Sequence, residues 1–234
     1  MKKLILLLLF IPIFSLAQVA KLKVNSIQDY ENLMNYAKLE NRPVIIDFVA
    51  DWCAPCKTMD KELWRSDEFR ELKNYFFIEV DIDKNSKLAR KYGIIAIPRV
   101  IVEVANDQKD ILIDKTGFLN KNQHLNDLQY INQFDFKEVY TAKNEIESGI
   151  AYRNLFITDI EKKHNILLKL SSKYFKKALK KEENNINQLN IIYNLKLKGS
   201  SKKANKNLEK LKLNKSSLSI AENEIIDKIV GKPY

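Results

Sequence analysis

The fold is decided by the stretch Val44-Ile45-Ile46-Asp47-Phe48-Val49-Ala50-Asp51-Trp52-Cys53-Ala54-Pro55-Cys56-Lys57, in which an apolar run leads directly to two cysteines separated by two residues. The sequence of 234 residues contains no other cysteine. A buried strand followed at once by a helix places the first sulfur at the helix N-terminus, where free N–H groups and the helix dipole stabilise a thiolate. Pro55 fits the first turn of that helix because no hydrogen bond is lost there. The pattern predicts Cys53 as the exposed nucleophile and Cys56 as the more buried resolving thiol.

Three interpretations of the cysteine pair have to be compared. A structural zinc site needs four ligands, and the chain offers only His124 and His164 besides the cysteines, without a second half-site at suitable spacing. A purely structural disulfide would add little stability, because closing so short a loop barely restrains the unfolded chain. Exchange between dithiol and disulfide is the chemistry that Cys-x-x-Cys beside a strand and a helix favours. We adopt it as the leading hypothesis and expect neither a metal nor a cofactor.

Several motifs in this region resemble those of the thioredoxin family. The segment Asp47-Phe48-x-Ala50-x-Trp52-Cys53-x-Pro55-Cys56-Lys57 is similar to the family's active-site segment. Further matches follow in the family's order at Val80-Asp81-Ile82-Asp83, Leu88-Ala89-Arg90-Lys91-Tyr92-Gly93-Ile94, Ile97-Pro98 and Thr116-Gly117-Phe118. The resemblance spans residues 22 to 134 and implies a thioredoxin fold, an α/β architecture with a central mixed sheet flanked by helices.

The resemblance also implies roles for individual residues. A carboxyl at Asp47, buried in an apolar strand, is expected to have a raised pKa and to exchange a proton with Cys56. The blander interpretation is an aspartate that accepts backbone hydrogen bonds at the strand end. Pro98 matches the cis-proline that faces the disulfide and leaves neighbouring backbone free to pair with an extended substrate. The expected substrate-binding residues are Trp52, Ile97, Pro98, Arg99 and Gly117, with ordinary packing as the alternative for Trp52.

The chain departs from the usual thioredoxin pattern at positions that line or underlie the substrate groove. These departures are Val49, Ala54, Arg99 and Glu79. Asp51-Trp52-Cys53 and Asp60, four residues after Cys56, look more like the periplasmic electron-accepting domains of transmembrane disulfide-reducing systems. If Asp60 and Asp47 both lie near Cys56, we expect the three groups to titrate as a coupled set, with Asp60 and Glu79 modulating proton transfer.

The first seventeen residues have the pattern of a secretory signal peptide. A basic start at Lys2-Lys3 precedes an apolar run from Leu4 to Phe14, and Ser15-Leu16-Ala17 has the small-x-small cleavage pattern. The run is too short to span a membrane, which takes about 20 apolar residues. We therefore expect cleavage after Ala17 and a location in the periplasm, where disulfides persist.

Charge divides the remaining chain into two predicted domains. Residues 18 to 130 carry 17 basic and 18 acidic residues, a net charge of −1, whereas residues 131 to 234 carry 21 and 12, a net charge of +9. The predicted organisation is a signal peptide at 1–17, a thioredoxin-like domain at 18–134 and a basic α-helical domain at 135–234. Because no Pro/Gly/Ser-rich linker separates the domains, the boundary depends on where the family resemblance ends.

The spacing of apolar residues, together with residues typical of helix caps and turns, predicts the helices and strands of the first domain. Ser26 with Asp29 resembles a capping box for a helix reaching Glu40, and residues 43–50 form a strand buried on both faces. The helix after Cys53 is predicted to end near Arg65, where Ser66 caps a further turn. Further predictions are a strand at 76–82, a helix at 86–92 closed by a glycine, a hairpin joining 100–104 to 111–113, and a helix carrying Leu125, Leu128 and Ile131.

The second domain contains apolar residues at helical spacing and no chemical motif. Its expected helices begin with the pattern Ile160, Leu167 and Leu170, and a capping box of Ser219 with Glu222 starts the last helix, which Gly231 ends. His124 and His164 are interpreted as ordinary helix residues. The lysines, with few arginines, argue against nucleic acid and favour a solvated face or a docking face for an acidic partner or an anionic membrane surface.

Three classes of function stay open at this stage. The leading hypothesis is a periplasmic thiol-disulfide oxidoreductase that reduces disulfides of protein clients, because Ala-Pro between the cysteines resembles the Gly-Pro of reductases and lacks the histidine common in strong oxidants. Its electron donor is unidentified, with a membrane disulfide-reducing system as the candidate. The second is a client-binding or chaperone-like module whose helical tail selects partners. The third is a structural protein that merely retains the fold.

Overall fold

The computed structural model describes residues 21–118, 120–159, 165–182, 184–213 and 217–231. The predicted signal peptide, with its cleavage after Ala17, lies outside the described residues, as do Ile160 and His164. Among the described helices, none combines the length and the apolar character that crossing a membrane requires.

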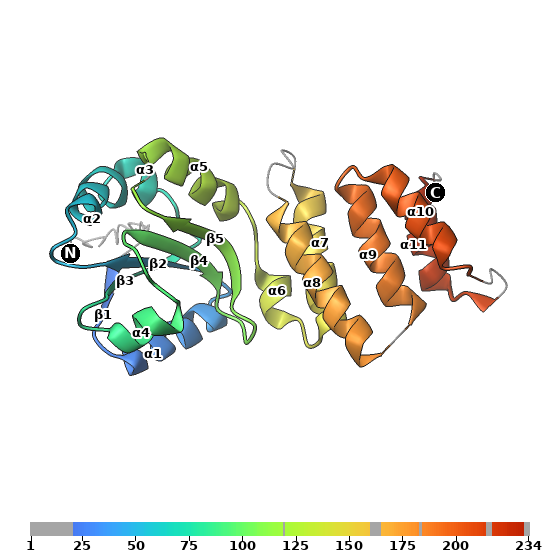
Figure 1. Ribbon diagram of the computed structural model, residues 1–234, viewed down its shortest axis with the longest axis horizontal. Coiled ribbons are helices and arrows are strands. Elements are labelled where there is room, and N and C mark those ends of the chain that lie inside the picture. Colours follow the sequence, from blue (N-terminus) through green and yellow to red (C-terminus); the bar gives the residue numbers. More distant parts are fainter. Residues whose placement is uncertain (1–20, 119, 160–164, 183, 214–216, 232–234) are drawn as a thin grey trace, which may run out of the picture.

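The N-terminal half is built around a mixed sheet of five strands in the order β1-β3-β2-β4-β5 (Figure 1). Strand β3 is parallel to β1 and β2, whereas β4 is antiparallel to β2 and β5. The elements are β1 (Lys21–Val24), α1 (Ile27–Leu39), β2 (Val44–Val49), α2 (Ala54–Met59), the π-helical segment η1 (Asp60–Trp64), α3 (Asp67–Arg70), β3 (Phe76–Asp81), α4 (Ser86–Lys91), β4 (Arg99–Val104), β5 (Asp110–Thr116) and α5 (Lys121–Asn132). The predicted thioredoxin fold, with helices on both faces of a mixed sheet, is confirmed.

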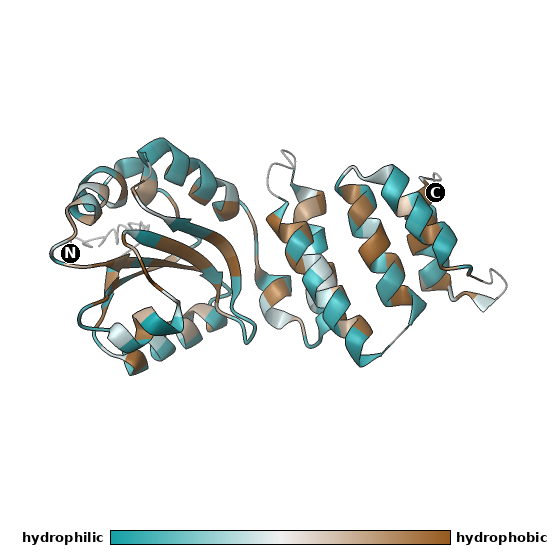
Figure 2. Ribbon diagram, in the orientation of Figure 1, coloured by the Kyte–Doolittle hydropathy of each residue, from teal (hydrophilic) through white to brown (hydrophobic). Residues whose placement is uncertain are grey.

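The side-chain alternation of β2 decides what each face of the sheet buries. Val44, Ile46 and Phe48 pack with α1 and α4 on one face, and Ile45 packs with η1, α3 and α5 on the other. Figure 2 shows brown, apolar strands between helices whose outer faces are teal. Asp47 shares the face of Ile45, so the alternation directs this carboxyl towards the helical side that carries the cysteines.

Most predicted helix boundaries in this half are confirmed. The predicted caps Ser26 and Ser66 each accept a hydrogen bond from a backbone N–H in the first turn of α1 and α3, and Asn120, which was not predicted, does the same for α5. The capping box at Ser26 is only half formed, because the Asp29 carboxylate accepts from the N–H of Asn25 instead. The four-residue strand β1 was absent from the predicted elements, since so short a stretch of alternating residues carries little periodic signal.

The C-terminal half is a row of helices, as predicted (Figure 1). It consists of α6 (Lys137–Thr141), α7 (Glu145–Thr158), α8 (Ile166–Lys181), α9 (Asn185–Leu197), α10 (Ser201–Lys210) and α11 (Ile220–Val230). The capping box of Ser219 with Glu222 and the left-handed Gly231 at the end of α11 are both present. The glycine has φ +77°, a backbone conformation that other residues rarely adopt.

Helices α6 to α8 share one hydrophobic core with the sheet. That cluster joins Val102, Val104 and Leu112 of β4 and β5 to Tyr152 of α7 and Leu167 of α8, with Phe134 and Phe136 between them. Helices α9 to α11 have a smaller cluster of their own, made by Leu189, Ile192, Ala204 and Ile229. The boundary predicted at residue 134 therefore falls inside a continuous core.

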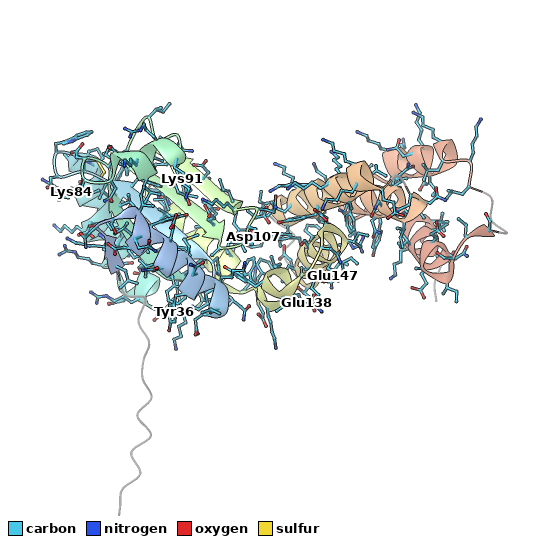
Figure 3. The ribbon with its side chains drawn as sticks, turned by 90° about the horizontal axis from the view of Figure 1, so that it is seen from below. Tyr36, Lys84, Lys91, Asp107, Glu138 and Glu147 are labelled. Atoms are coloured by element: carbon cyan, nitrogen blue, oxygen red, sulfur yellow. A yellow bond between two sulfur atoms is a disulfide. The ribbon has the colours of Figure 1, made fainter. Side chains whose placement is uncertain are left out.

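A polar network joins the β4–β5 turn to the helices. Asp110 is fully buried and accepts hydrogen bonds from the hydroxyls of Tyr152 at 2.8 Å and Tyr174 at 2.5 Å, while the ammonium of Lys173 lies 2.5 Å away. Asn106 adds a hydrogen bond of 2.8 Å from the turn itself. Figure 3 shows Asp107 of the same turn beside the helices that carry Glu138 and Glu147. The turn is thus fixed to α7 and α8 by hydrogen bonds as well as by apolar contact.

Candidate active site

Cys53 and Cys56 form a disulfide at the start of α2. Cys53 is the N-cap residue, and its sulfur accepts a hydrogen bond of 3.2 Å from the backbone N–H of Cys56. Pro55 occupies the first turn, as predicted. An N–H group directed at the sulfur and an adjoining helix N-terminus are features that favour a thiolate at such a position.

The expectation of an exposed Cys53 is wrong for this oxidised state. The two cysteines are equally buried, at 3% and 4% exposure, and pack with Ala50 and the side chain of Ile97. The residues that reach solvent are apolar neighbours: Trp52 is 67% exposed and Ile95 is 95% exposed. The indole N–H of Trp52 donates to the Asp83 carboxylate at 2.8 Å, which fixes the orientation of the ring.

Asp47 lies beneath the disulfide in a pocket of about 600 Å³ that Cys56 also lines. The carboxyl is 1% exposed, and its Oδ1 has no hydrogen-bond partner among the described residues. Burial raises the pKa of Asp47 to about 7, with Lys21 opposing the rise and Glu79 adding to it. A carboxyl with this pKa exchanges protons readily near neutral pH.

Asp60 and Glu79 line the same pocket and are linked by Lys21. The Lys21 ammonium lies 2.6 Å from Asp60 Oδ1 and also contacts the Glu79 carboxylate. Partial burial favours a higher pKa for Asp60, but hydrogen bonds and charge from Lys21 and Arg65 outweigh it and lower that pKa. The structure thus brings Asp47, Asp60 and Cys56 into one pocket. Of the two aspartates, Asp47 has a raised pKa and Asp60 a lowered one.

The loop before β4 faces the disulfide. The peptide bond between Ile97 and Pro98 is cis, as predicted. The Pro98 carbonyl accepts a hydrogen bond of 2.8 Å from the N–H of Gly117, which has φ +89°. Among the described residues, the Ile97 backbone makes no hydrogen bond, so its N–H and C=O are free to pair with an extended segment.

Arg99 uses its side chain within the fold. Its guanidinium donates to both carboxylate oxygens of Asp114 at 2.8 Å each, and to the Gly93 carbonyl at 3.1 Å. A bidentate pair of this kind holds the side chain in one orientation along the β4–β5 strands. Its predicted contact with a substrate would therefore involve the backbone or the apolar stem of the side chain.

Two residues of the pocket escaped the sequence analysis. Lys21 is far from the cysteines in sequence and reaches Asp60 and Glu79 only because β1 pairs with β3. Trp64 comes from η1, where its indole N–H acts against the rise in the pKa of Asp47, although no well-formed hydrogen bond joins them in the described structure. The sequence feature that could have indicated a role for Trp64 is its position, eight residues after Cys56.

No cluster of three or more His, Cys, Asp and Glu side chains in the described part of the chain is arranged to hold a metal ion. His124 is a buried residue of α5 that lies beside the Trp64 ring, with centroids 6.3 Å apart.

Comparison with known proteins places the chain among redox proteins. The family model Thioredoxin matches residues 21–128. The thioredoxin of Mycoplasmoides gallisepticum is 30% identical over 98 residues, which are 40% of this chain and 93% of that protein. Thioredoxin 2 of Plasmodium falciparum is 28% identical over 95 residues, 41% of this chain and 58% of that protein.

A larger relative is the thiol:disulfide interchange protein DsbD of Campylobacter jejuni, which is 29% identical over 114 residues. These are 46% of this chain and 19% of that protein, so the chain spans only part of the length of DsbD and of the Plasmodium thioredoxin. Among solved structures, a poplar thioredoxin h superposes with a TM-score of 0.43 and 18% identity, over 49% of this chain and 97% of the other.

The residues matched by the family model include the cysteine pair, and one thioredoxin is matched over 93% of its length at 30% identity. The chain therefore belongs to the thioredoxin family of disulfide oxidoreductases, and Cys53 with Cys56 is its redox-active pair.

Proposed function

We propose that this protein is a periplasmic thiol-disulfide oxidoreductase that reduces disulfides of protein clients through the Cys53-Ala-Pro-Cys56 dithiol. The observation that carries the proposal is the position of Cys53 as N-cap of α2, with Asp47 buried beside Cys56 in one pocket. The reducing direction is supported by the Ala-Pro pair between the cysteines, which lacks the histidine common in strong oxidants. The periplasmic location is supported by the signal-peptide pattern of residues 1 to 17.

The reaction proceeds in two exchanges. The Cys53 thiolate attacks one sulfur of the client disulfide, so that a mixed disulfide forms and the other client sulfur leaves as a thiolate. Cys56 then gives its proton to Asp47 and attacks the Cys53 sulfur, which releases the second client sulfur and forms the Cys53–Cys56 bond. The client gains two electrons and the protein loses two. A further dithiol donor must therefore reduce the pair before each new cycle.

An exposed apolar surface beside the disulfide suits an extended client segment. Trp52, Ile95 and Phe118 are 67%, 95% and 46% exposed. The Ile97 side chain packs against the disulfide, and its backbone, free of hydrogen bonds among the described residues, can pair with the client chain. Contact through backbone and through apolar side chains suits many protein clients.

For the electron donor, we propose a membrane disulfide-reducing system. The support is the similarity of 46% of this chain to part of DsbD, which is named a thiol:disulfide interchange protein. To test this, the purified oxidised protein is incubated with a donor dithiol protein. Alkylation of the free thiols and a gel shift then measure whether the donor reduces the Cys53–Cys56 disulfide.

Trapping of clients tests the proposed function directly. In Cys56→Ser the resolving thiol is lost, so mixed disulfides on Cys53 should accumulate and appear as higher bands on non-reducing gels. Cys53→Ser should trap none and should lose insulin reduction. Equal trapping by both variants, or adducts through Cys56 alone, would show that the nucleophile is wrongly assigned.

A groove between α8 and α9 supports a second role, in which the helical region selects partners. The groove has a volume of about 490 Å³ and is lined by Lys169, Lys173, Lys176, Lys177, Lys180 and Lys198 with Asn165, Leu168, Ser172, Asn194 and Leu195. Among the described residues, no carboxylate lines it. Lys173 and Lys177 are engaged with Asp110 and Gln108, which leaves the remaining four lysines to face a partner.

An acidic polypeptide is the occupant that this groove favours over an anionic membrane. Leu168 and Leu195 line a concave groove together with the lysines, whereas membrane contact favours apolar side chains that project outwards. Asn194 is 2% exposed, and its Oδ1 has no partner in the described structure. That oxygen has almost no exposed surface, so it does not distinguish one occupant of the groove from another.

Charge reversal with a matched control tests the groove. The triple variant Lys169→Glu, Lys176→Glu, Lys180→Glu should weaken binding of poly-L-glutamate at least tenfold in fluorescence anisotropy. The control variant Lys202→Glu, Lys203→Glu, Lys206→Glu has the same net charge but alters α10, outside the groove. Equal loss in both variants would contradict the groove, and binding to anionic vesicles alone would indicate a membrane surface instead.

A further inference from the structure

A charged network beneath the disulfide centres on Lys21. Its ammonium lies 2.6 Å from Asp60 Oδ1 and contacts the Glu79 carboxylate, while its side chain is only 24% exposed. The three residues come from β1, η1 and β3. One cation therefore bridges two carboxylates that separate elements bring into the same pocket, and Arg65 also pairs with Asp60.

The same network faces Asp47. Asp47 and Glu79 are paired positions on the neighbouring parallel strands β2 and β3, so their side chains leave the same face of the sheet. Lys21 lies on the other side of β3, at the start of β1. The charged groups that line the pocket around Asp47 are Lys21, Lys23, Asp51, Lys57, Asp60, Lys61, Arg65 and Glu79.

We propose that Lys21 is a positioning residue for the resolving step: it holds Asp60 and Glu79 and supplies the positive charge that keeps Asp47 able to take the proton of Cys56. The inference rests on the proposed function, because that proton leaves Cys56 as its sulfur attacks Cys53. Lys21 touches neither sulfur and acts only through the carboxyl groups.

The electrostatic reason is the number of carboxyl groups in one pocket. Removal of Lys21 would leave Asp47, Asp60 and Glu79 with less compensating charge. Burial is the main cause of the raised pKa of Asp47, and the nearby Lys21 charge is the largest influence that lowers it again. Without Lys21, a larger fraction of Asp47 is protonated at neutral pH, and this fraction cannot accept a proton.

Lys23 provides a matched control on the same strand. It is two residues further along β1, and its ammonium lies 3.8 Å from Glu79, but its side chain is 76% exposed. Solvent screens a charge in that position, so it influences Asp47 far less than Lys21 does. The two lysines thus differ in burial more than in chemistry.

Titration of Asp47 in the oxidised protein tests the inference without any client. The carboxyl carbon of ¹³C-labelled aspartate reports the ionisation, with Asp47→Asn identifying the resonance. In Lys21→Met the midpoint should rise by about one pH unit or more, whereas Lys21→Arg should keep it near the native value. Lys23→Met should move it little, and Glu79→Gln should lower it.

The second measurement is the pH profile of client release from the mixed disulfide. Its midpoint should move to higher pH in Lys21→Met, in step with the Asp47 titration. An unchanged Asp47 midpoint in Lys21→Met, or an equal change in Lys23→Met, would overturn the inference. A shifted titration with an unshifted release profile would also overturn it, because Lys21 would then have no part in the resolving step. Failure of the proposed function is distinguishable, because the native protein would then reduce no client disulfide at any pH while its titration stayed measurable.

Discussion

At the scale of single residues, the ionisation of Asp47 carries a cost in stability. Its pKa is about 7 in the folded protein against an ordinary value of 3.8. The folded state therefore holds the proton more tightly than the unfolded state. The contribution of the protonated Asp47 to the free energy of unfolding is fully present below about pH 4. It is lost as the pH rises through the pKa of Asp47 in the folded protein. The residue that serves proton transfer thus weakens the fold at working pH.

We predict that Asp47→Asn stabilises the oxidised protein at pH 8, because the amide stays neutral when the carboxyl would be charged. The gain should be on the order of 4 kcal/mol as an upper limit, since one pKa unit corresponds to about 1.4 kcal/mol. Urea unfolding at pH 8 and at pH 4.5 measures it, with a much smaller difference between variant and native protein expected at pH 4.5. A variant that is equally stabilised at both pH values would contradict the raised pKa.

The sequence alone predicts the site residues that belong to short, recognisable motifs. The cysteines, Asp47 and Pro98 follow from one continuous segment and one loop with a familiar motif. Lys21 could not be predicted, because only the order β1-β3-β2 brings it beside Glu79 and Asp60. The fixed side chain of Arg99 was equally hidden, since its partner Asp114 lies on the antiparallel strand β5.

At the scale of elements, Asp110 joins the β4–β5 hairpin to α7 and α8. Burial alone favours a raised pKa, but hydrogen bonds from Lys173, Tyr174 and their neighbours outweigh it and lower the pKa of Asp110. A depressed pKa stabilises the fold above the ordinary value of 3.8, and this stabilisation is lost as pH falls below it. The junction between sheet and helices is therefore expected to weaken in acid.

We predict that Asp110→Ala lowers the free energy of unfolding at pH 7 by about 3 kcal/mol, because Tyr152 loses its buried acceptor and Lys173 its partner. Urea unfolding followed by circular dichroism measures the loss. Asp107→Ala in the same turn is the control, since its ion pair with Lys38 is exposed and should contribute less than about 1 kcal/mol. Equal effects of the two changes would contradict a special role for Asp110.

Element boundaries were predictable where a cap residue marks them. Ser66, Gly93 and Ser219 end or begin helices through side chains or backbone angles that are local to the sequence. The π-helical turn of η1 carries no such mark, because it depends on how Leu63 and Trp64 pack beneath the sheet.

At the scale of the whole molecule, the shared core predicts unequal effects of two truncations. A chain ending at residue 134 would uncover Val104 and Leu112 of the sheet, and each fully buried apolar side chain contributes about 1.5 to 3 kcal/mol. A chain ending at residue 182 removes only α9 to α11, which have their own cluster. The boundary at residue 134 was predicted because the family resemblance ends there and the net charge changes nearby. Neither feature shows which residues pack together in one core.

We predict that the protein ending at residue 182 unfolds cooperatively and reduces insulin, whereas the one ending at residue 134 aggregates or unfolds at much lower temperature. Differential scanning calorimetry and an insulin turbidity assay measure the two properties. If the shorter protein matches the longer one in both, the thioredoxin half is an independent unit and α6 to α8 are an attachment to it.

The redox pair and the lysine-lined groove lie far apart along the molecule: Figure 1 shows α2 in the sheet-containing half and α9 in the row of helices beyond α6. A client held in the groove by an acidic segment would be tethered, and its disulfide would reach Cys53 at an effective concentration set by the length of the intervening chain. Clients whose linker is too short gain nothing from the tether, and very long linkers dilute the gain. Spacing along the client chain would then select substrates as strongly as the sequence around the disulfide.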